Sequence, residues 1–367
     1  MKRALIVLVL MACDEGRVQP PFVRSDVGVR AGDDGAVTDD ASVRADAAMR
    51  RDSSFTPFDD DAAVVAAPDG GMRCPPGFVL NGTMCVANVP GNPALHTRDE
   101  VCAAFRMGHI ENASNGGFSK SNAMCDPGSV SRDGLDDALR RLTFQRWLAG
   151  IGPATESESA HTRAQACALI AAWNPVGPQA HSPAPSAECY TAEGAGAAGQ
   201  SNIAWGNGTA AQAIDQWMED NGNDTTFGHR RWMLNPPLSD VGIGAYVGGN
   251  NYGSSSCLSV FGSGGSSTGP AMIAYPPPGF VPDVLARQVW TLQGQVPTSN
   301  LAITVRSNGA VLPTAIAVLN GNYGNSSGLR IDRMGWNPMR DQTYEVEVTG
   351  DGVAPIQFSM TPISCPP

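Results

Sequence analysis

The stretch Gly228-His229-Arg230-Arg231-Trp232-Met233-Leu234 lies where the chain changes from a helical to a β pattern. Before it, residues 209–220 place four apolar side chains at helical spacing on one face. After it, residues 241–247 and 257–261 are short, apolar and bounded by Gly, Asn and Ser, which is typical of strands. We therefore expect helices upstream of this stretch and strands downstream of it.

Two further helices are expected upstream. Residues 135–148 show apolar residues at helical spacing after Ser131, a residue type that favours the N-terminal end of a helix. Residues 164–173 form the second, which Asn174-Pro175 should end because the residue before a proline avoids helical geometry.

A domain boundary is indicated by the Gly/Ser-rich residues 262–269 and the three consecutive prolines within residues 274–279. Short β-rich runs follow, separated by Gly, Asn and Asp turns. We expect them to form a small all-β sandwich. The runs are residues 289–292, 302–306, 314–319, 343–349 and 356–360.

The N-terminus has the features of a bacterial lipoprotein signal. A basic start is followed by the apolar residues 4–12, too few to span a bilayer, which needs about 20. Leu10-Met11-Ala12-Cys13 resembles the lipobox, which implies cleavage before Cys13 and acylation of that residue. The alternative is a degenerate secretory signal cleaved elsewhere. A lipid anchor in the bacterial cell envelope is expected, extracytoplasmic and facing the periplasm or the cell surface.

Charge is distributed unevenly along the chain. Lys and Arg number 24 and Asp and Glu 35, a net charge of −11 that argues against a nucleic-acid partner. Residues 14–73 hold 13 of the acids and seven arginines, without a sustained apolar period, so we expect a disordered acidic tether. Its Asp runs lack the spacing of a calcium-binding loop.

Nine cysteines become an even set of eight once Cys13 carries the lipid. Proximity along the chain suggests four disulfides, although eight cysteines permit 105 pairings. The pairs expected are Cys74–Cys85, Cys102–Cys125, Cys167–Cys189 and Cys257–Cys365.

Two of the five histidines have distinctive settings. His181 follows the helix expected over residues 164–173, and His229 follows the helix expected over residues 209–220. Brought together, two histidines can hold a divalent metal or act as a general acid and base, whereas the alternative is that each packs a helix end. Arg230 and Arg231 could form an anion site, but the role expected for them is a solvated or salt-bridged face.

The order of motifs resembles the CAP superfamily, which includes cysteine-rich secretory proteins, venom antigens and plant pathogenesis-related proteins. The resemblance covers about residues 135–261. It implies an α-β-α sandwich whose central cleft carries a His/Glu tetrad. The segments that carry it are Ala168–Asn174, His181-Ser182, Ser201–Gly206, Trp217, Gly228–Pro236 and Val241–Gly244.

Carried over position by position, the tetrad is incomplete. His181 and His229 match the two histidines, but Ser201 stands where the family has its first glutamate. Glu219 and Asp220 are both available for the second acid. Two imidazoles with one acid make a poorer zinc site than two imidazoles with two acids. No cofactor is therefore expected to be required, with Zn²⁺ as the metal that could bind at His181 and His229.

The fold expected is α+β: a CAP-like α-β-α sandwich, then a β-sandwich, after a disordered tether. The function expected is a non-catalytic binding module for a lipid, a sterol, or a cell-surface protein or glycan. One alternative is a His-assisted or metal-dependent hydrolase acting on an extracytoplasmic polymer, and another makes the C-terminal sandwich the binding part. The segments are 1–12 (signal), 13–73 (tether), 74–94 (disulfide loop), 95–269 (CAP-like) and 270–367 (β-sandwich).

Overall fold

A computed structural model describes the backbone of residues 78–81 and 84–87, together with residues 92–250, 252–262, 269–321, 323–324 and 327–366. The expected signal, the lipidated Cys13, the tether and the Cys74–Cys85 bridge lie outside the described residues. The first described elements are β1 (Phe78–Asn81) and β2 (Met84–Ala87), which pair as an antiparallel hairpin whose second strand contacts α3.

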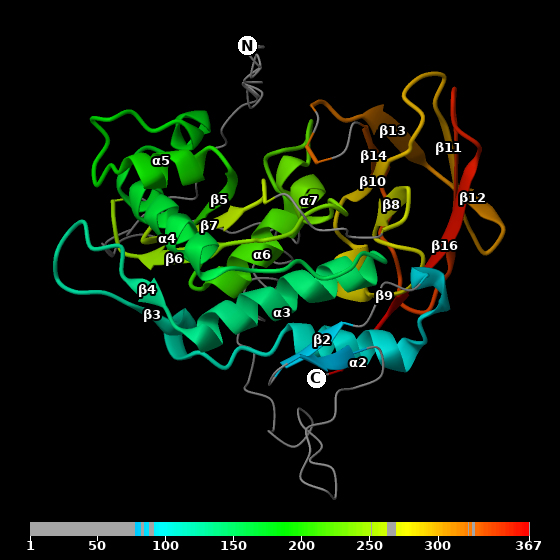
Figure 1. Cartoon of the computed structure of the whole chain (residues 1–367). Coiled ribbons are helices and arrows are strands. Elements are labelled where there is room, and N and C mark those ends of the chain that lie inside the picture. The colour runs from blue at the N-terminus through cyan, green and yellow to red at the C-terminus, as the bar shows by residue number, and fades with distance from the viewer. Residues whose placement is uncertain are drawn as a thin grey trace, which may run out of the picture.

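The middle of the chain forms an α-β-α sandwich, as expected from the sequence (Figure 1). One face of an antiparallel sheet is covered by α4 (Glu158–Trp173) and α5 (Ala192–Ala198). The other face packs against α3 (Arg132–Leu148), α6 (Ala210–Glu219) and α7 (Gly228–Met233). The strands, in spatial order, are β5 (Ser201–Trp205), β7 (Ser254–Ser259) and β6 (Ile243–Val247).

Two glycines explain how closely β6 approaches α4. A Cβ atom on Gly242 would lie 2.0 Å from the carbonyl oxygen of Ala160, and one on Gly244 would lie 2.3 Å from the backbone of Ala164. Only glycine permits this backbone-to-backbone contact. The Val-Gly-Ile-Gly sequence is therefore a packing requirement of the helix on the sheet. At the N-terminal end of α4, the Ser157 side chain accepts from the amide of Ala160.

The C-terminal region is a two-sheet β-sandwich, also as expected. One sheet has the order β13-β14-β10-β8 and the other β12-β11-β15-β16-β9. A short helix, α8 (Asp283–Ala286), connects the two sheets. The strands are β8 (Met272–Tyr275), β9 (Gly279–Pro282), β10 (Trp290–Gly294), β11 (Ala302–Ser307), β12 (Ala310–Leu312), β13 (Thr314–Val318), β14 (Gly328–Arg333), β15 (Tyr344–Thr349) and β16 (Ile356–Ile363).

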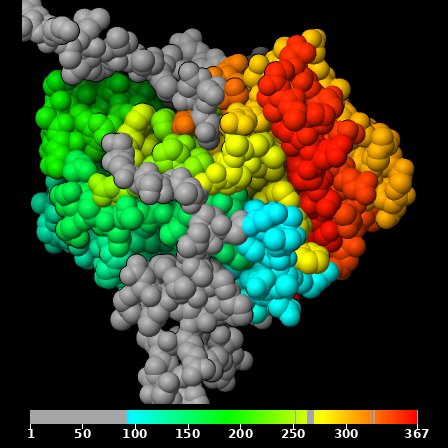
Figure 2. Space-filling view, turned by 45° about the vertical axis from the view of Figure 1, so that its right-hand side comes forward, coloured from blue at the N-terminus to red at the C-terminus, as the bar shows by residue number. Residues whose placement is uncertain are grey.

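A helix that the sequence analysis did not predict, α2 (Arg98–Gly108), packs on this sandwich rather than on the three-stranded sheet. Its Thr97 forms a capping box with Glu100. Val101 and Ala104 join one hydrophobic core with Trp290 of the sandwich and Trp147 of α3. In Figure 2 this helix, in cyan, lies beside the red C-terminal strand.

The remaining short elements are η2 (Pro93–Leu95), η3 (Ser114–Gly117), β3 (Phe118–Ser119), β4 (Ser129–Val130) and η4 (Pro178–His181). Of these, η2 contacts β9, η3 contacts α3, η4 contacts α5, and β3 and β4 contact β6. The two-residue strands β3 and β4 pair with each other.

The six cysteines from Cys102 to Cys365 form disulfides, but the three pairings expected for them are wrong. The bonds are Cys102–Cys365, Cys125–Cys189 and Cys167–Cys257. Proximity along the chain failed because the fold brings α2 beside the C-terminus and α4 against β7, across 263 and 90 residues. Disulfides indicate an oxidising, extracytoplasmic compartment. Among the helices that the structure describes, none has the length and apolar character that a membrane crossing requires.

The expectation of a solvated face at Arg230 and Arg231 is also wrong, since both side chains are fully buried. Arg230 donates to the carbonyl oxygens of Met218 (2.6 Å) and Val289 (2.7 Å). Arg231 donates to those of Asn320 (2.8 Å) and Gly321 (3.0 Å). Val289 precedes β10, and residues 320–321 follow β13, so α7 is bonded directly to the sandwich.

Candidate functional site

His229 occupies the first turn of the six-residue helix α7. The helix starts after Phe227, whose φ is 45°, and a Cβ atom on Gly228 would lie 2.7 Å from the ring of Tyr323. Glycine is therefore required at position 228 for the sandwich residue Tyr323 to pack there. The side chain of His229, about a quarter exposed at 26%, follows immediately.

Asp220 binds His229 and fixes the start of α7. Its backbone ends α6 in the left-handed region (φ 56°), and its side chain is fully buried. Oδ1 accepts from Nδ1 of His229 at 2.7 Å and from the Asn223 amide at 2.7 Å. Oδ2 accepts from the backbone N–H of Arg230 at 3.2 Å. The Asn223 amide also lies 2.9 Å from Nδ1 of His229, but the shorter contact with a carboxylate favours a proton on Nδ1 and leaves the ring's lone pair on Nε2.

Glu219, the other acid considered for this position, has different partners. Its Oε2 accepts from the Asn221 side chain at 3.2 Å. Desolvation and the nearby carboxylate of Asp215 raise its pKa, and Arg230 opposes that shift. Of the two acids that the sequence left open, the structure pairs Asp220 with His229.

His181 ends η4, and its Nδ1 lies 3.0 Å from the carbonyl oxygen of Ala198. Burial lowers the pKa of His181, and the charge that His229 can carry lowers it further, whereas the Ala198 carbonyl opposes both effects. The two histidines are 48 residues apart in the sequence. Burial and His229 both favour the neutral imidazole of His181.

Ser201 is the first residue of β5 and is buried. Its hydroxyl donates to the carbonyl oxygen of Ala197 at 2.8 Å. The position therefore supplies no carboxylate, and its hydroxyl is already hydrogen-bonded to the backbone. We call the set His181, Ser201, Asp220 and His229 the histidine site.

The histidine site does not fit the zinc ligand set that the CAP resemblance implied. Both oxygens of Asp220 are hydrogen-bonded to protein donors, and a neutral serine hydroxyl is not among the usual zinc ligands. Within the part of the chain that the structure describes, only Cys125, Glu188 and Cys189 bring three potential ligand atoms together, and these two sulfurs are joined in a disulfide.

Residues 148–261 match the family model of CAP, the cysteine-rich secretory protein family. The chain contains a CAP domain. The match includes the whole histidine site and both α7 arginines, whereas α2 and the β-sandwich lie outside it. No curated protein and no solved structure matches the chain.

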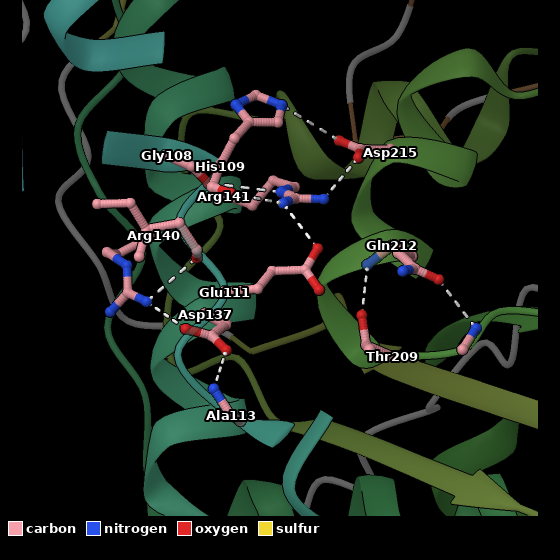
Figure 3. Close-up of polar contacts among 12 residues, drawn as sticks. Gly108, His109, Glu111, Ala113, Asp137, Arg140, Arg141, Thr209, Gln212 and Asp215 are labelled. Carbon is pink, nitrogen blue, oxygen red and sulfur yellow. Dashed lines mark hydrogen bonds and ion pairs between the residues drawn. The ribbon is translucent and has the colours of Figure 1, made fainter. Parts of the chain in front are cut away.

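A second polar cluster lies between α2, α3 and α6, at the edge of the CAP domain (Figure 3). Arg141 donates to Asp215 at 2.7 Å and to Glu111 at 3.0 Å. Nε2 of His109 lies 3.8 Å from Asp215, and its Nδ1 lies 2.8 Å from the carbonyl oxygen of Phe105. Sequence analysis missed this cluster because no spacing relates residues 109, 141 and 215.

The environment of His109 disfavours its charge. Burial, and secondarily the positive charge of Arg141, lower its pKa to about 3, although the Phe105 carbonyl opposes the shift. Burial also raises the pKa of Asp215, against the effect of Arg141. The cluster is therefore held by the Arg141–Asp215 ion pair with a neutral histidine beside it.

A pocket of about 420 Å³ opens beside α4, and no residue of the histidine site is among those that line it. Its volume is within the usual range for small-molecule sites, and its walls are mostly apolar. The lining residues are Cys125, Pro127, Ala166, Leu169, Pro185, Ala187, Cys189, Tyr190 and Thr191.

Asp220→Asn and Glu219→Gln form a matched pair that tests the assignment of the acid. We expect Asp220→Asn to lower the free energy of unfolding by about 2 kcal/mol, because it weakens charge-assisted bonds to His229 and to the start of α7. Glu219→Gln should be neutral or slightly stabilising at pH 7, since the fold disfavours the Glu219 charge. Urea unfolding measures both, and equal losses in the two variants would contradict the assignment.

His109→Gln should weaken the decrease in the free energy of unfolding that occurs as the pH falls below 6.5. In the native state the pKa of His109 is about 3, below its ordinary value of 6.5. The unfolded chain therefore takes up this proton first, and stability is lost as pH falls from 6.5 toward 3, by roughly 1.4 kcal/mol per pH unit. Replacing His109 removes that contribution from the slope.

Urea unfolding at pH 7, 6, 5 and 4 measures the His109 effect as a difference in slope between wild type and variant. Asp215 and Glu219 titrate in both proteins, so their contribution largely cancels in the comparison. Parallel profiles would show that His109 is not held neutral.

Proposed function

We propose that this protein is an extracytoplasmic, lipid-anchored binding protein, whose CAP domain holds a lipid, sterol or surface partner without catalysing a reaction. The family match and the disulfides support the extracytoplasmic setting. The lipobox-like residues before Cys13 support the anchor.

The engagement of Asp220 carries the non-catalytic part of the proposal. Three donors, from His229, Asn223 and Arg230, occupy its carboxylate, and the Ser201 hydroxyl is bonded to the backbone. Neither Asp220 nor Ser201 therefore presents an unengaged polar group to a substrate. The hydrogen bonds of Asp220 hold α6 and α7 together, which is a structural role.

The pocket beside α4 supports an apolar ligand. Its walls contain two prolines, Leu169 and the ring of Tyr190, and it is partly open to solvent. Such walls gain free energy from covering hydrocarbon and offer few polar groups to a hydrophilic substrate. We assign the ligand to this pocket.

One observation favours the alternative of a His-assisted hydrolase. A histidine whose Nδ1 donates to a buried carboxylate is held in a fixed tautomer with Nε2 available, as in general-base catalysis. His181→Ala/His229→Ala separates the two functions, because it removes any acid–base pair and leaves the pocket intact.

Ligand retention tests the proposal. The purified full chain is incubated with sterol-containing phosphatidylcholine vesicles, re-isolated, and analysed for bound lipid, sterol and zinc. We expect wild type and His181→Ala/His229→Ala to retain apolar ligand without stoichiometric zinc. In Ala187→Trp, the larger side chain fills the pocket from a partly exposed wall. We expect this variant to retain about tenfold less apolar ligand, because a clash between the indole ring and the ligand costs roughly 1.4 kcal/mol or more.

Two results would contradict this proposal. The first is the absence of any lipid or sterol on the wild-type chain. The second is stoichiometric zinc that disappears in His181→Ala/His229→Ala, because it would restore the metal-dependent alternative. Glu219→Gln is the control for a surface change close to the histidine site.

A further inference from the structure

One end of the β-sandwich combines exposed apolar side chains with arginines. Met334 and Met339 are 57% and 62% exposed and belong to the connection between β14 and β15. Beside them are Arg333, Arg340 and, after α8, Arg287. We call these five residues the sandwich-end patch.

Hydrogen bonds show that the arginines of the patch are neighbours. Arg340 and Arg287 donate to the same oxygen of Asp283, at 2.7 and 3.3 Å, and Arg333 donates to the carbonyl oxygens of Arg287 and Gln288. Two guanidinium groups therefore share one buried carboxylate, and the third is bonded to the backbone beside them. The patch keeps an excess of two positive charges on a chain whose net charge is −11. It is suited to an acidic partner with apolar side chains.

The start of α2 lies beside this patch. Arg98, the first residue of α2, pairs with Asp341 at 2.6 Å, and Asp341 directly follows Arg340. The Arg98–Asp341 pair balances its own charges and leaves the excess on the patch unchanged.

The acidic N-terminal segment contains one stretch with matching chemistry. Residues 55–61 read Phe-Thr-Pro-Phe-Asp-Asp-Asp, and in residues 14–73 this is the one place where aromatic residues adjoin a run of acids. Three carboxylates can pair with the arginines. Phenyl rings make favourable contacts with methionine sulfur.

Chain length permits the contact within one molecule. Residues 62–77 link this stretch to strand β1 and can span up to roughly 55 Å when extended. A folded body of this size is about 40 to 50 Å across. A short linker gives a segment tethered in this way an effective concentration of the order of millimolar.

We propose that residues 55–61 dock on the sandwich-end patch of their own chain, with Asp59, Asp60 and Asp61 paired to its arginines and the two phenylalanines against its methionines. The N-terminal segment is then held against the fold about midway between Cys13 and α2. This proposal is independent of the ligand and of the histidine site.

A peptide-binding experiment on full chains tests the docking. The probe is a fluorescein-labelled peptide of residues 53–64, and a peptide with the three aspartates changed to asparagine is the control. Full-length Asp59→Asn/Asp60→Asn/Asp61→Asn should bind the probe about tenfold more tightly than wild type, whose patch is already covered in cis. Added salt should weaken this binding.

Patch variants are made in the same triple-asparagine background. Arg287→Gln/Arg340→Gln should lose about tenfold in probe binding. Met334→Asp/Met339→Asp, which changes only exposed side chains, should also weaken probe binding about tenfold. The test then does not depend on the hydrogen bonds between Asp283 and the arginines. Arg163→Gln/Arg306→Gln, at exposed arginines outside the patch, should bind like the triple-asparagine parent.

The proposal is overturned if the triple-asparagine chain binds the probe no better than the control peptide, or if the patch variants bind it unchanged. It is also overturned if wild type and the triple-asparagine chain bind phosphatidylglycerol vesicles equally and through the patch arginines. That result would make the patch a membrane-facing surface that is open in the native chain.

Discussion

Two buried arginines in α7 determine how the parts of this molecule are arranged. The side chains of Arg230 and Arg231 are fully buried. A buried charge is costly unless hydrogen bonds satisfy it. Here the carbonyl oxygens of Met218, Val289, Asn320 and Gly321 do so, and the rings of Tyr275 (4.6 Å) and Tyr323 (5.4 Å) cover the guanidinium groups.

These bonds connect two regions that the sequence presents as separate. The CAP match ends at residue 261, yet the partners of its arginines extend to residue 323 of the sandwich. The side chain of His229 is bonded to Asp220, and Arg230 and Arg231 directly follow His229 in the sequence. The position of His229 therefore depends on the sandwich as well as on the CAP domain. A third arginine, Arg146 of α3, binds the carbonyl oxygens of Met233 and Asn235 and secures the C-terminal end of the same short helix.

The sequence was most informative where a local pattern has one physical explanation. The helical faces of α4 and α6, the glycines of β6 and the turn-separated strands of the sandwich lead to the architecture that the structure has. Positions set by distant partners were not predictable. The choice of Cys365 as partner of Cys102 depends on α2 lying beside the C-terminus. Burial of Arg231 depends on carbonyl groups about 90 residues away.

The histidine site shows the same division. Sequence comparison with the family identified His181, His229 and the serine at position 201. It could not choose between Glu219 and Asp220, because the choice depends on where α6 ends. Asp220 takes a left-handed conformation there, which directs its carboxylate into the fold. The cluster of His109, Arg141 and Asp215 was missed because its members come from three helices and share no motif.

Native-state hydrogen exchange on Arg231→Ala tests most directly whether the α7 arginines join the CAP domain and the sandwich into one cooperative unit. The account predicts that protection falls together in α7, β13 and β14, by an amount corresponding to about 3 kcal/mol, while exposed Arg163→Ala changes none of them. Loss of protection confined to α7, with β13 and β14 as stable as in wild type, would contradict it.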